Sequence, residues 1–311
     1  MVGAGAWGAA LAIQAAQAGR DVALWARDPQ PLRATRRSVH LPGHRLPDSV
    51  EVMAALPGSG FDAVVLVVPM QHMRAVLNGW RPSAPVVLCA KGIEAGTGLL
   101  PAELLQALHP GVPAVVLTGP NFAHEVAAGL PAAAVVSGHD AGLRDQVMAL
   151  LATPRFRLYG NDDPLGAQLG GAAKNVIAIA AGAVVGAGLG ENARAALVTR
   201  GLAELSRLVA ALGGRAETVA GLSGLGDLLL TCTGTASRNY SLGVALGRGE
   251  ALAAVLAQRS GVTEGVRTAP ALVTRAAGVE LPVCSAVADL LAGARLDPVI
   301  AALLARPRRD E

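Results

Sequence analysis

The sequence predicts an α/β domain with a mostly parallel sheet, followed by a domain built of helices alone. In the first half, short Val-rich runs alternate with helical stretches, which is the pattern of βαβ units. Most of these runs are apolar throughout, as expected for strands buried on both faces of a parallel sheet. After residue 159 almost no strand pattern remains, and Gly, Asn, Asp and Pro gather in a turn cluster at 160–164. We therefore expect domains at 1–160 and 161–311.

The composition excludes several classes of protein. Of the 311 residues, 52% are hydrophobic and 16% are charged, so the chain can bury a core and is not disordered. The net charge of +3 is not gathered into a basic run, which argues against nucleic acid binding. The uncharged stretch 175–190 is shorter than the roughly 20 residues of a spanning helix, so we expect a core helix and no membrane span. Three scattered cysteines and an opening without a secretion signal favour the cytoplasm and no metal cluster.

In the first domain the predicted elements alternate regularly. Strands are expected at 21–25, 62–68, 85–89, 113–118, 132–137 and 155–159. Helices are expected around them, at 6–18, 71–78, 97–108, 121–128 and 141–151.

The second domain shows helical periodicity. Residues 191–212 predict an amphipathic helix with Arg200 and Glu204 on its outer face. Thr268 and Ser285 are predicted as N-caps of two later helices. These later helices are expected at 241–258, 268–277 and 285–292.

A glycine motif opens the chain. Gly3, Gly5 and Gly8 form GxGxxG at the start of the first predicted helix and ahead of the next strand. The first glycine allows a tight turn, the second lets a pyrophosphate approach the backbone, and the third lets the helix pack closely. This pattern predicts a Rossmann-type dinucleotide site. Only Met1 and Val2 precede the motif, so the central first strand is shortened and the true start of the chain stays open.

The end of the next strand bears on which dinucleotide is bound. An acidic residue there holds the ribose hydroxyls of NAD, whereas an arginine accommodates the 2′-phosphate of NADP. Arg27 is present and Asp28 follows it, so NADP is favoured and NAD is not excluded. A solvated turn pair is the alternative interpretation of these two residues.

Lysine is scarce in this chain, because only Lys91 and Lys174 among the 26 Lys and Arg residues are lysines. An arginine stays protonated, whereas a lysine can be tuned to give and take a proton, so both lysines are candidates for chemistry. Lys91 follows a predicted strand, at the edge where open α/β sheets bind ligands. Lys174 opens the apolar helical stretch and is either partly buried, which suits proton transfer, or reaches solvent from a helix end.

The densest polar cluster lies at 221–239, where a Gly-rich stretch leads to Asp227 and the hydroxyls of Thr231 and Thr233 come next. Ser237, Arg238 and Asn239 follow, directly ahead of a predicted helix. Arginine can hold a phosphate with two donors, while serine and asparagine can bond hydroxyls, so the set suits a small phosphorylated polyol. The six histidines show no ligand spacing and predict no metal site. Cys284 is expected to be a packed core thiol.

These motifs resemble those of the bacterial NAD(P)-dependent glycerol-3-phosphate dehydrogenase family over nearly the whole chain. The segments that carry the resemblance begin at Gly3 (GAGAWGAALA), Leu66 (LVVPMQ), Ala90 (AKGIEAGTG), Leu117 (LTGPNFAHEVAAGLP), Gln168 (QLGGAAKNVIAIAAG), Glu191 (ENARAALVTRGLAE), Gly221 (GLSGLGDLLLTCTGTASRNYSLG) and Val262 (VTEGVRTA). The resemblance implies a Rossmann-like domain and a helical domain like that of 6-phosphogluconate dehydrogenase.

The resemblance also implies roles for individual residues. Lys174 matches the proton donor and acceptor, and Lys91 and Asp227 match its catalytic partners. The implied substrate contacts are Lys91, Gly119, Asn121, Lys174, Asp227, Ser237, Arg238 and Asn239, with Asn121 standing where the family usually has Thr or Ser. The implied cofactor contacts are Gly3, Gly5, Ala6, Trp7, Gly8, Arg27, Lys91, Ala123, Arg238, Val262 and Glu264, with Ala6 replacing a common Ser.

The implied function is reversible hydride transfer between NAD(P)H and dihydroxyacetone phosphate, giving sn-glycerol 3-phosphate for phospholipid synthesis in the cytoplasm. The implied cofactor is NADP or NAD, the partner is this small substrate, and a homodimer through the helical domain is a further expectation. Two other hypotheses stay open. One is a related dehydrogenase acting on a 3-hydroxyacid or 6-phosphogluconate, against which the Ser-Arg-Asn block argues. The other is a non-catalytic dinucleotide-sensing protein, which would not need Lys174 at a cleft.

Overall fold

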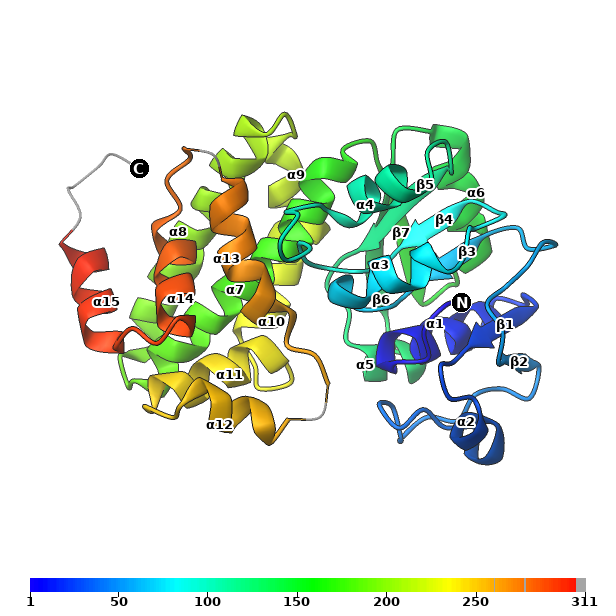
Figure 1. Ribbon diagram of the computed structural model, residues 1–311, viewed down its shortest axis with the longest axis horizontal. Helices are drawn as coiled ribbons and strands as arrows, with labels where there is room; N and C mark the ends of the chain where they lie inside the picture. The colour runs from blue at the N-terminus through cyan, green and yellow to red at the C-terminus, as the bar shows by residue number, and fades with distance from the viewer. Residues whose placement is uncertain (260, 277, 306–311) are drawn as a thin grey trace. The chain divides into compact units, whose positions relative to one another are not determined.

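The computed structural model describes residues 1–259, 261–276 and 278–305 (Figure 1). It forms two compact units. The first unit contains residues 1–91 and 99–168, and the second contains residues 92–98 and the chain from 169 on. The predicted fold class is confirmed: the first unit is an α/β domain with a mostly parallel sheet, and the described part of the second is helical. Residue 160 lies within the last strand, β7 (Phe156–Asn161), and the units divide at residue 168, within helix α7 (Pro164–Gly186).

The sheet of the first unit is parallel apart from the junction between β5 and β6. Strands β3 (Val64–Leu66), β4 (Val86–Leu88), β5 (Ala114–Thr118), β6 (Ala132–Ser137) and β7 pair in sequence order, with β6 antiparallel to β5. A parallel pair of β1 (Val22–Trp25) and β2 (Val50–Met53) joins them through Val2, which bridges both Trp25 and Leu66. Val2 therefore stands in the position of the central first strand.

Several local features of this unit escape the sequence patterns. β2 and the short helix α2 (Gln30–Thr35) have no predicted counterpart, because β2 is four residues long and carries an exposed Glu51. The turn predicted at 160–164 is wrong at its first two positions, since Gly160 and Asn161 belong to the β6–β7 ladder. The Ser137 hydroxyl bonds to Asn161 Oδ1 at 3.0 Å and extends that ladder past the glycine.

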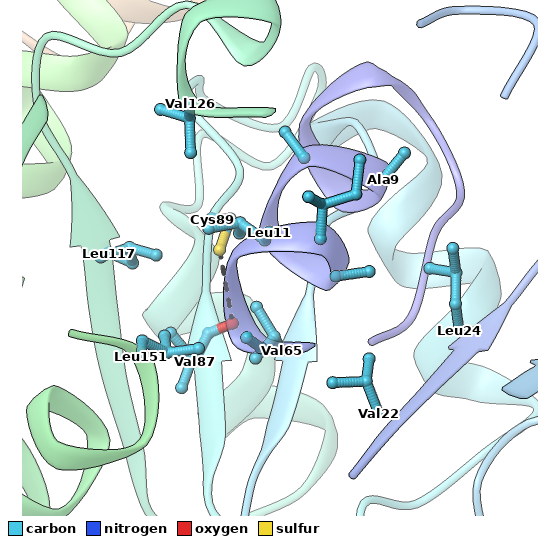
Figure 2. Packing of buried hydrophobic residues seen from close by; sticks show 14 of the residues in the cluster. Ala9, Leu11, Val22, Leu24, Val65, Val87, Cys89, Leu117, Val126 and Leu151 are labelled. Carbon is cyan, nitrogen blue, oxygen red and sulfur yellow. Dashed lines mark hydrogen bonds between the residues drawn. The ribbon is translucent and has the colours of Figure 1, made fainter. Parts of the chain in front are cut away.

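Helices pack on both faces of this sheet. They are α1 (Ala6–Gln17), α3 (Met70–Asn78), α4 (Pro101–Leu108), α5 (Ala123–Ala127) and α6 (Ala141–Leu151). One hydrophobic cluster joins Val65 and Val87 to α1, α5 and α6, and a second joins alternate strand residues to α3 and α4. Figure 2 shows α1 against the strands, with Leu11 beside Cys89. Because α1 follows Val2 after a short turn, its first turn lies at the carboxyl edge of the strands.

The second unit is built around α7. By length and composition this helix could cross a membrane, but 89% of its most apolar 18 residues are buried in the protein, so it is a core helix. The elements that follow it in this unit are α8 (Gly190–Ala211), α9 (Ala216–Ala220), one π-helical turn η1 (Leu222–Gly226), α10 (Asp227–Cys232), α11 (Arg238–Gly247), α12 (Leu252–Ala257), α13 (Glu264–Arg275), α14 (Pro282–Leu291) and α15 (Leu296–Leu304).

Some predicted helix bounds in this unit are wrong. α7 begins at Pro164, so Lys174 lies inside the helix rather than at its start. The predicted helix 241–258 is two helices, α11 and α12, because Gly249 takes a φ of +86°. Thr268 and Ser285 lie inside α13 and α14 and do not cap them. Residue 277, the predicted end of helix 268–277, lies outside the described residues.

Helices α7 and α11 cross with their backbones in contact. Gly182 and Gly186 on α7 face Gly243 and Gly247 on α11. An added Cβ on Gly182 would overlap the carbonyl oxygen of Tyr240, and one on Gly243 would overlap a carbonyl oxygen of α7. This spacing brings the helix that carries Lys174 close to the helix that begins with Arg238.

Gly182→Ala should therefore destabilise the protein, although Gly→Ala inside a helix ordinarily stabilises by about 0.5–1 kcal/mol. Forcing the two backbones apart costs about 1–3 kcal/mol, so the sign of the effect reverses. Urea unfolding measures the difference. Gly234→Ala is the control, because its Cβ would meet nothing within 4 Å, and a Gly182→Ala variant at least as stable as wild type would contradict the close crossing.

The prediction that Glu204 faces outward on α8 is wrong. Its side chain is buried and accepts hydrogen bonds from the backbone N–H groups of Val283 at 2.7 Å and Cys284 at 3.3 Å. These groups belong to the first turn of α14, so Glu204 caps that helix from a neighbouring one. Burial raises the pKa of Glu204, and the two backbone bonds offset part of that rise.

Glu204→Gln should change how stability depends on pH. Because the pKa of Glu204 in the folded protein lies above its ordinary value of 4.5, the folded state keeps a proton that the unfolded chain has lost. The stability from this group is highest below that value and falls as pH rises through the raised pKa. Urea unfolding at stepped pH should show a steeper fall for wild type than for Glu204→Gln. Exposed Glu217→Gln is the control, and parallel profiles for wild type and Glu204→Gln would count against the buried cap.

Candidate functional site

The glycine motif forms a turn whose geometry fits a phosphate group. Gly3 has a φ of +115°, which favours glycine, and a Cβ on Gly8 would overlap the Gly3 carbonyl oxygen. A Cβ on Gly5 would meet nothing within 4 Å, so open space lies beside it. α1 starts here without a side-chain cap, which leaves its first N–H groups oriented toward that space. The Ser38 hydroxyl bonds to the Ala4 carbonyl at 2.7 Å and holds the turn.

Three other predicted cofactor residues of the first unit lie at the starts of helices, and a fourth follows a strand. Ala6 and Trp7 open α1, and Ala123 opens α5. Arg27 is exposed just after β1, while the neighbouring Asp28 accepts a hydrogen bond from the Gln30 backbone N–H at 3.2 Å. Asp28 thus supports the start of α2, and both Arg27 and Asp28 are exposed at this strand end.

Lys91, Gly119 and Asn121 come together beyond the ends of β4 and β5. Lys91 Nζ donates to the Gly119 carbonyl oxygen at 2.9 Å, and Asn121 Nδ2 donates to the Ala133 carbonyl at 3.0 Å. Gly119 has a φ of +139°, and its Cβ would lie 3.0 Å from the Cα of Ala134. Glycine is therefore required where the chain turns against β6.

Two polar atoms near this turn are buried with no hydrogen-bond partner in the described part of the chain, namely Asn121 Oδ1 and Thr118 Oγ1. Buried polar atoms without partners are rare, and a bound ligand would complete them. Thr118 was not singled out by the sequence, because a hydroxyl at the end of a Val-rich strand is unremarkable without its surroundings.

Lys174 and Asp227 form a buried ion pair in the second unit. The ammonium group of Lys174 donates to a carboxylate oxygen of Asp227 and to Thr231 Oγ1 at 2.8 Å. Asp227 is fully buried, and Thr231 in turn donates to the Asp227 carbonyl oxygen at 2.6 Å. Asp227 and Thr231 are four residues apart on α10, so both face α7. The sequence places Thr231 in the polar cluster at 221–239 but does not predict its bond to Lys174.

Close backbone approach brings α10 to Lys174. A Cβ on Gly170 of α7 would lie 2.6 Å from the Ser223 carbonyl oxygen, and a Cβ on Gly224 would overlap the Val219 carbonyl. The first contact seats the π-helical turn η1 on α7, and the second packs η1 against α9, directly before Asp227 begins α10. Burial raises the pKa of the neighbouring Cys232 thiol to about 12, so this thiol stays protonated beside the ion pair.

A chain of amides ties together the neighbours of three predicted site residues. Asn239 Nδ2 donates to Asn175 Oδ1 at 2.9 Å, and the Gly265 backbone N–H donates to Asn239 Oδ1 at 3.0 Å. Asn175 follows Lys174, Asn239 follows Arg238, and Gly265 follows Glu264. Sequence spacing cannot reveal this chain, because the three helices that supply it are far apart along the sequence.

The starts of α11 and α13 carry four of the predicted site residues, namely Ser237, Arg238, Val262 and Glu264. Ser237 is the N-cap of α11, where its oxygen accepts from the Tyr240 N–H at 3.2 Å. Arg238 is exposed and lines a surface pocket of about 440 Å³. Val262 is half-buried, and Glu264 is the first residue of α13.

Two family models together match most of the chain. Residues 1–143 match the N-terminal model of NAD-dependent glycerol-3-phosphate dehydrogenase, and residues 163–299 match its C-terminal model. The chain belongs to this dehydrogenase family.

Similar proteins within the glycerol-3-phosphate dehydrogenase family cover the full chain. A glycerol-3-phosphate dehydrogenase [NAD(P)+] of Acidiphilium cryptum is 57% identical over 100% of this chain and 97% of its own. Its counterpart in Gluconobacter oxydans is 51% identical over 100% and 98%. Among solved structures, the glycerol-3-phosphate dehydrogenase of Coxiella burnetii is 34% identical, with a TM-score of 0.93 over 98% of both chains.

None of the described residues of this dehydrogenase family member suggests a metal or a reactive thiol. No group of three or more His, Cys, Asp or Glu side chains among them could hold a metal ion. Burial raises the pKa of the Cys89 thiol to about 12 and that of Cys284 well above its ordinary value. The packed thiol expected at Cys284 is confirmed, since its side chain is 2% exposed.

Asp227→Ala should destabilise the protein strongly. The substitution leaves the Lys174 ammonium buried without its carboxylate, which costs about 3–5 kcal/mol. The double variant Lys174→Met with Asp227→Leu should recover most of that loss, because a well-packed apolar pair replaces both charges. Urea unfolding of both variants measures these differences, and an Asp227→Ala variant as stable as wild type would show that the pair is not buried in solution.

Proposed function

We propose that this chain is an NAD(P)-dependent glycerol-3-phosphate dehydrogenase, an oxidoreductase that interconverts dihydroxyacetone phosphate and sn-glycerol 3-phosphate. The observation that carries the proposal is the buried ammonium of Lys174, held by Asp227 and Thr231 in a chain that matches the family in both halves. The product would serve phospholipid synthesis in the cytoplasm, and we expect the second unit to form a homodimer.

The glycine turn and the first turn of α1 hold the phosphates of the dinucleotide. When bound, NAD(P)H supplies the hydride. Arg27, exposed at the end of β1, neutralises a 2′-phosphate, which favours NADPH over NADH. The remaining cofactor contacts in this proposal are Ala6, Trp7, Lys91, Ala123, Arg238, Val262 and Glu264.

Lys174 gives a proton to the carbonyl oxygen of the substrate as negative charge develops there. Asp227 and Thr231 orient the ammonium, so the proton is presented from a fixed position. Lys91 adds positive charge for the same oxygen, and its bond to the Gly119 carbonyl holds the amine in place. In the reverse direction Lys174 receives the hydroxyl proton of glycerol 3-phosphate.

Arg238 grips the phosphate end of the substrate with its guanidinium group. The Ser237 oxygen accepts from Tyr240, which leaves its own O–H to donate to a substrate oxygen. Asn239 uses one N–H in its bond to Asn175 and keeps a second for the substrate. Gly119 and Asn121 are further substrate contacts in this proposal, with the buried Asn121 Oδ1 accepting a hydrogen bond from a substrate hydroxyl.

The purified protein should consume NADPH, and NADH more slowly, when mixed with dihydroxyacetone phosphate. Lys174→Ala should lower turnover about 10²–10⁴-fold, because general acid catalysis is lost, while fluorescence titration still detects NADPH binding. Absorbance of the reduced cofactor measures turnover.

Lys174→Arg is the matched variant for the role of Lys174, because it keeps the positive charge but cannot release a proton near neutral pH. It should be as inactive as Lys174→Ala, with thermal melting used to confirm that both variants are folded. Turnover near the wild-type rate in either variant would refute the proton-transfer role, and cofactor binding without turnover by wild type would point to a sensing protein.

A further inference from the structure

Two residues after α12, Arg259 and Gly261, lie beside Arg238. Arg259 lies two residues beyond the end of α12, and Gly261 follows shortly after. Arg259 donates to the backbone of Arg238, and the position that a Cβ of Gly261 would occupy lies against the Arg238 guanidinium group. Neither residue belongs to the site as described above.

Arg259 fixes the backbone at the start of α11. Its Nη1 donates to the Arg238 carbonyl oxygen at 2.7 Å and to Ser241 Oγ at 3.1 Å, while Ser241 Oγ itself donates to the same carbonyl at 3.2 Å. The three groups form a closed set of hydrogen bonds around the first turn of the helix. Since Arg238 is the first residue of α11, these bonds set the direction in which its side chain leaves the helix.

Gly261 leaves room for the guanidinium group of Arg238. Its φ is +103°, and a Cβ at this position would lie 2.8 Å from Arg238 Nη1. That distance is shorter than a carbon–nitrogen contact allows, so any side chain here would push the guanidinium aside. The arginine tip is flexible, so the cost would appear as a displaced Arg238 rather than as an unfolded protein.

Arg259 also contributes charge beside Arg238. Both arginines line the pocket of about 440 Å³, together with Ser241, Gln258 and Glu250. Burial, followed by the nearby Arg238 charge, lowers the pKa of Arg259, while Glu250 acts in the opposite direction. Two cations held close together repel each other and attract an anion more strongly than either alone.

We propose that Arg259 and Gly261 are positioning residues for Arg238, which they aim at the phosphate group of the substrate. The inference rests on the proposed function, in which Arg238 grips that phosphate. Arg259 acts by fixing the backbone at the start of α11 and by adding positive charge beside Arg238. Gly261 acts by leaving room for the Arg238 guanidinium group.

The test compares substrate kinetics of Arg259→Ala with those of Arg248→Ala, an exposed arginine just after α11. Arg259→Ala should raise the KM for dihydroxyacetone phosphate about tenfold, the equivalent of one charged contact, with kcat changed less than twofold. The Ki of inorganic phosphate as a competitor should rise by the same factor, whereas the Kd for NADPH should rise less than twofold, because Arg238 is only one of several cofactor contacts. Arg259→Lys should recover most of the loss, because its ammonium can still donate to the Arg238 carbonyl.

Gly261→Ala tests the second contact, with Gly293→Ala as its control. Gly293 has a φ of +102°, but its Cβ would meet nothing within 4 Å, so both variants place a side chain at the same positive φ and only one meets Arg238. Only Gly261→Ala should raise the KM and the phosphate Ki. If Arg259→Ala does not fold, the comparison of Gly261→Ala with Gly293→Ala still tests the positioning role.

The outcomes separate this inference from the function on which it rests. If wild type is active, and the folded Arg259→Ala and Gly261→Ala variants behave like their controls, the positioning role is overturned. The proposed function then still stands. A rise in the Kd for NADPH equal to that in KM would assign the two residues to the cofactor phosphate and overturn the substrate assignment. A wild type that does not reduce dihydroxyacetone phosphate would overturn the proposed function and this inference with it.

Discussion

The second unit depends on holding one ammonium group, that of Lys174, inside an apolar bundle of helices. A charge without partners in such a place is costly, so the surrounding helices must supply a carboxylate and a hydroxyl at short range. Asp227 and Thr231 do so from α10, and their own backbone bond keeps them on one face. A buried ion pair adds little to stability compared with an apolar pair of equal volume, so its presence here is best explained by chemistry.

Glycine contacts let the helices come close enough for this arrangement. The π-helical turn η1 rests on Gly170, and α11 crosses α7 where Gly182 meets Gly243. At these points one backbone occupies the space that a side chain would otherwise fill. The spacing between α7, α10 and α11, and hence the positions of Lys174, Asp227 and Arg238, follows from residues that carry no functional group.

The first unit uses the same principle at the carboxyl edge of its sheet. Gly8 lets α1 start against the turn formed by Gly3, and Gly119 lets the chain turn tightly against β6. Lys91 is held there by a backbone carbonyl, while Thr118 and Asn121 each present a buried oxygen with no partner among the described residues. Polar atoms left in this state at the ligand-binding edge of an α/β sheet are suited to a bound molecule.

The sequence by itself determined the fold class, the glycine motif, the two lysines and the family, because periodicity, spacing and rare residue types are properties of the chain. It could not locate Glu204, which helical periodicity and i,i+4 spacing place on the outside but which caps α14 from within. It also could not show what Thr231, Asn175 and Arg259 bond to, since each partner lies on another element. Only the tertiary structure decided these roles, because the distance between two side chains on different helices depends on how closely their backbones pack.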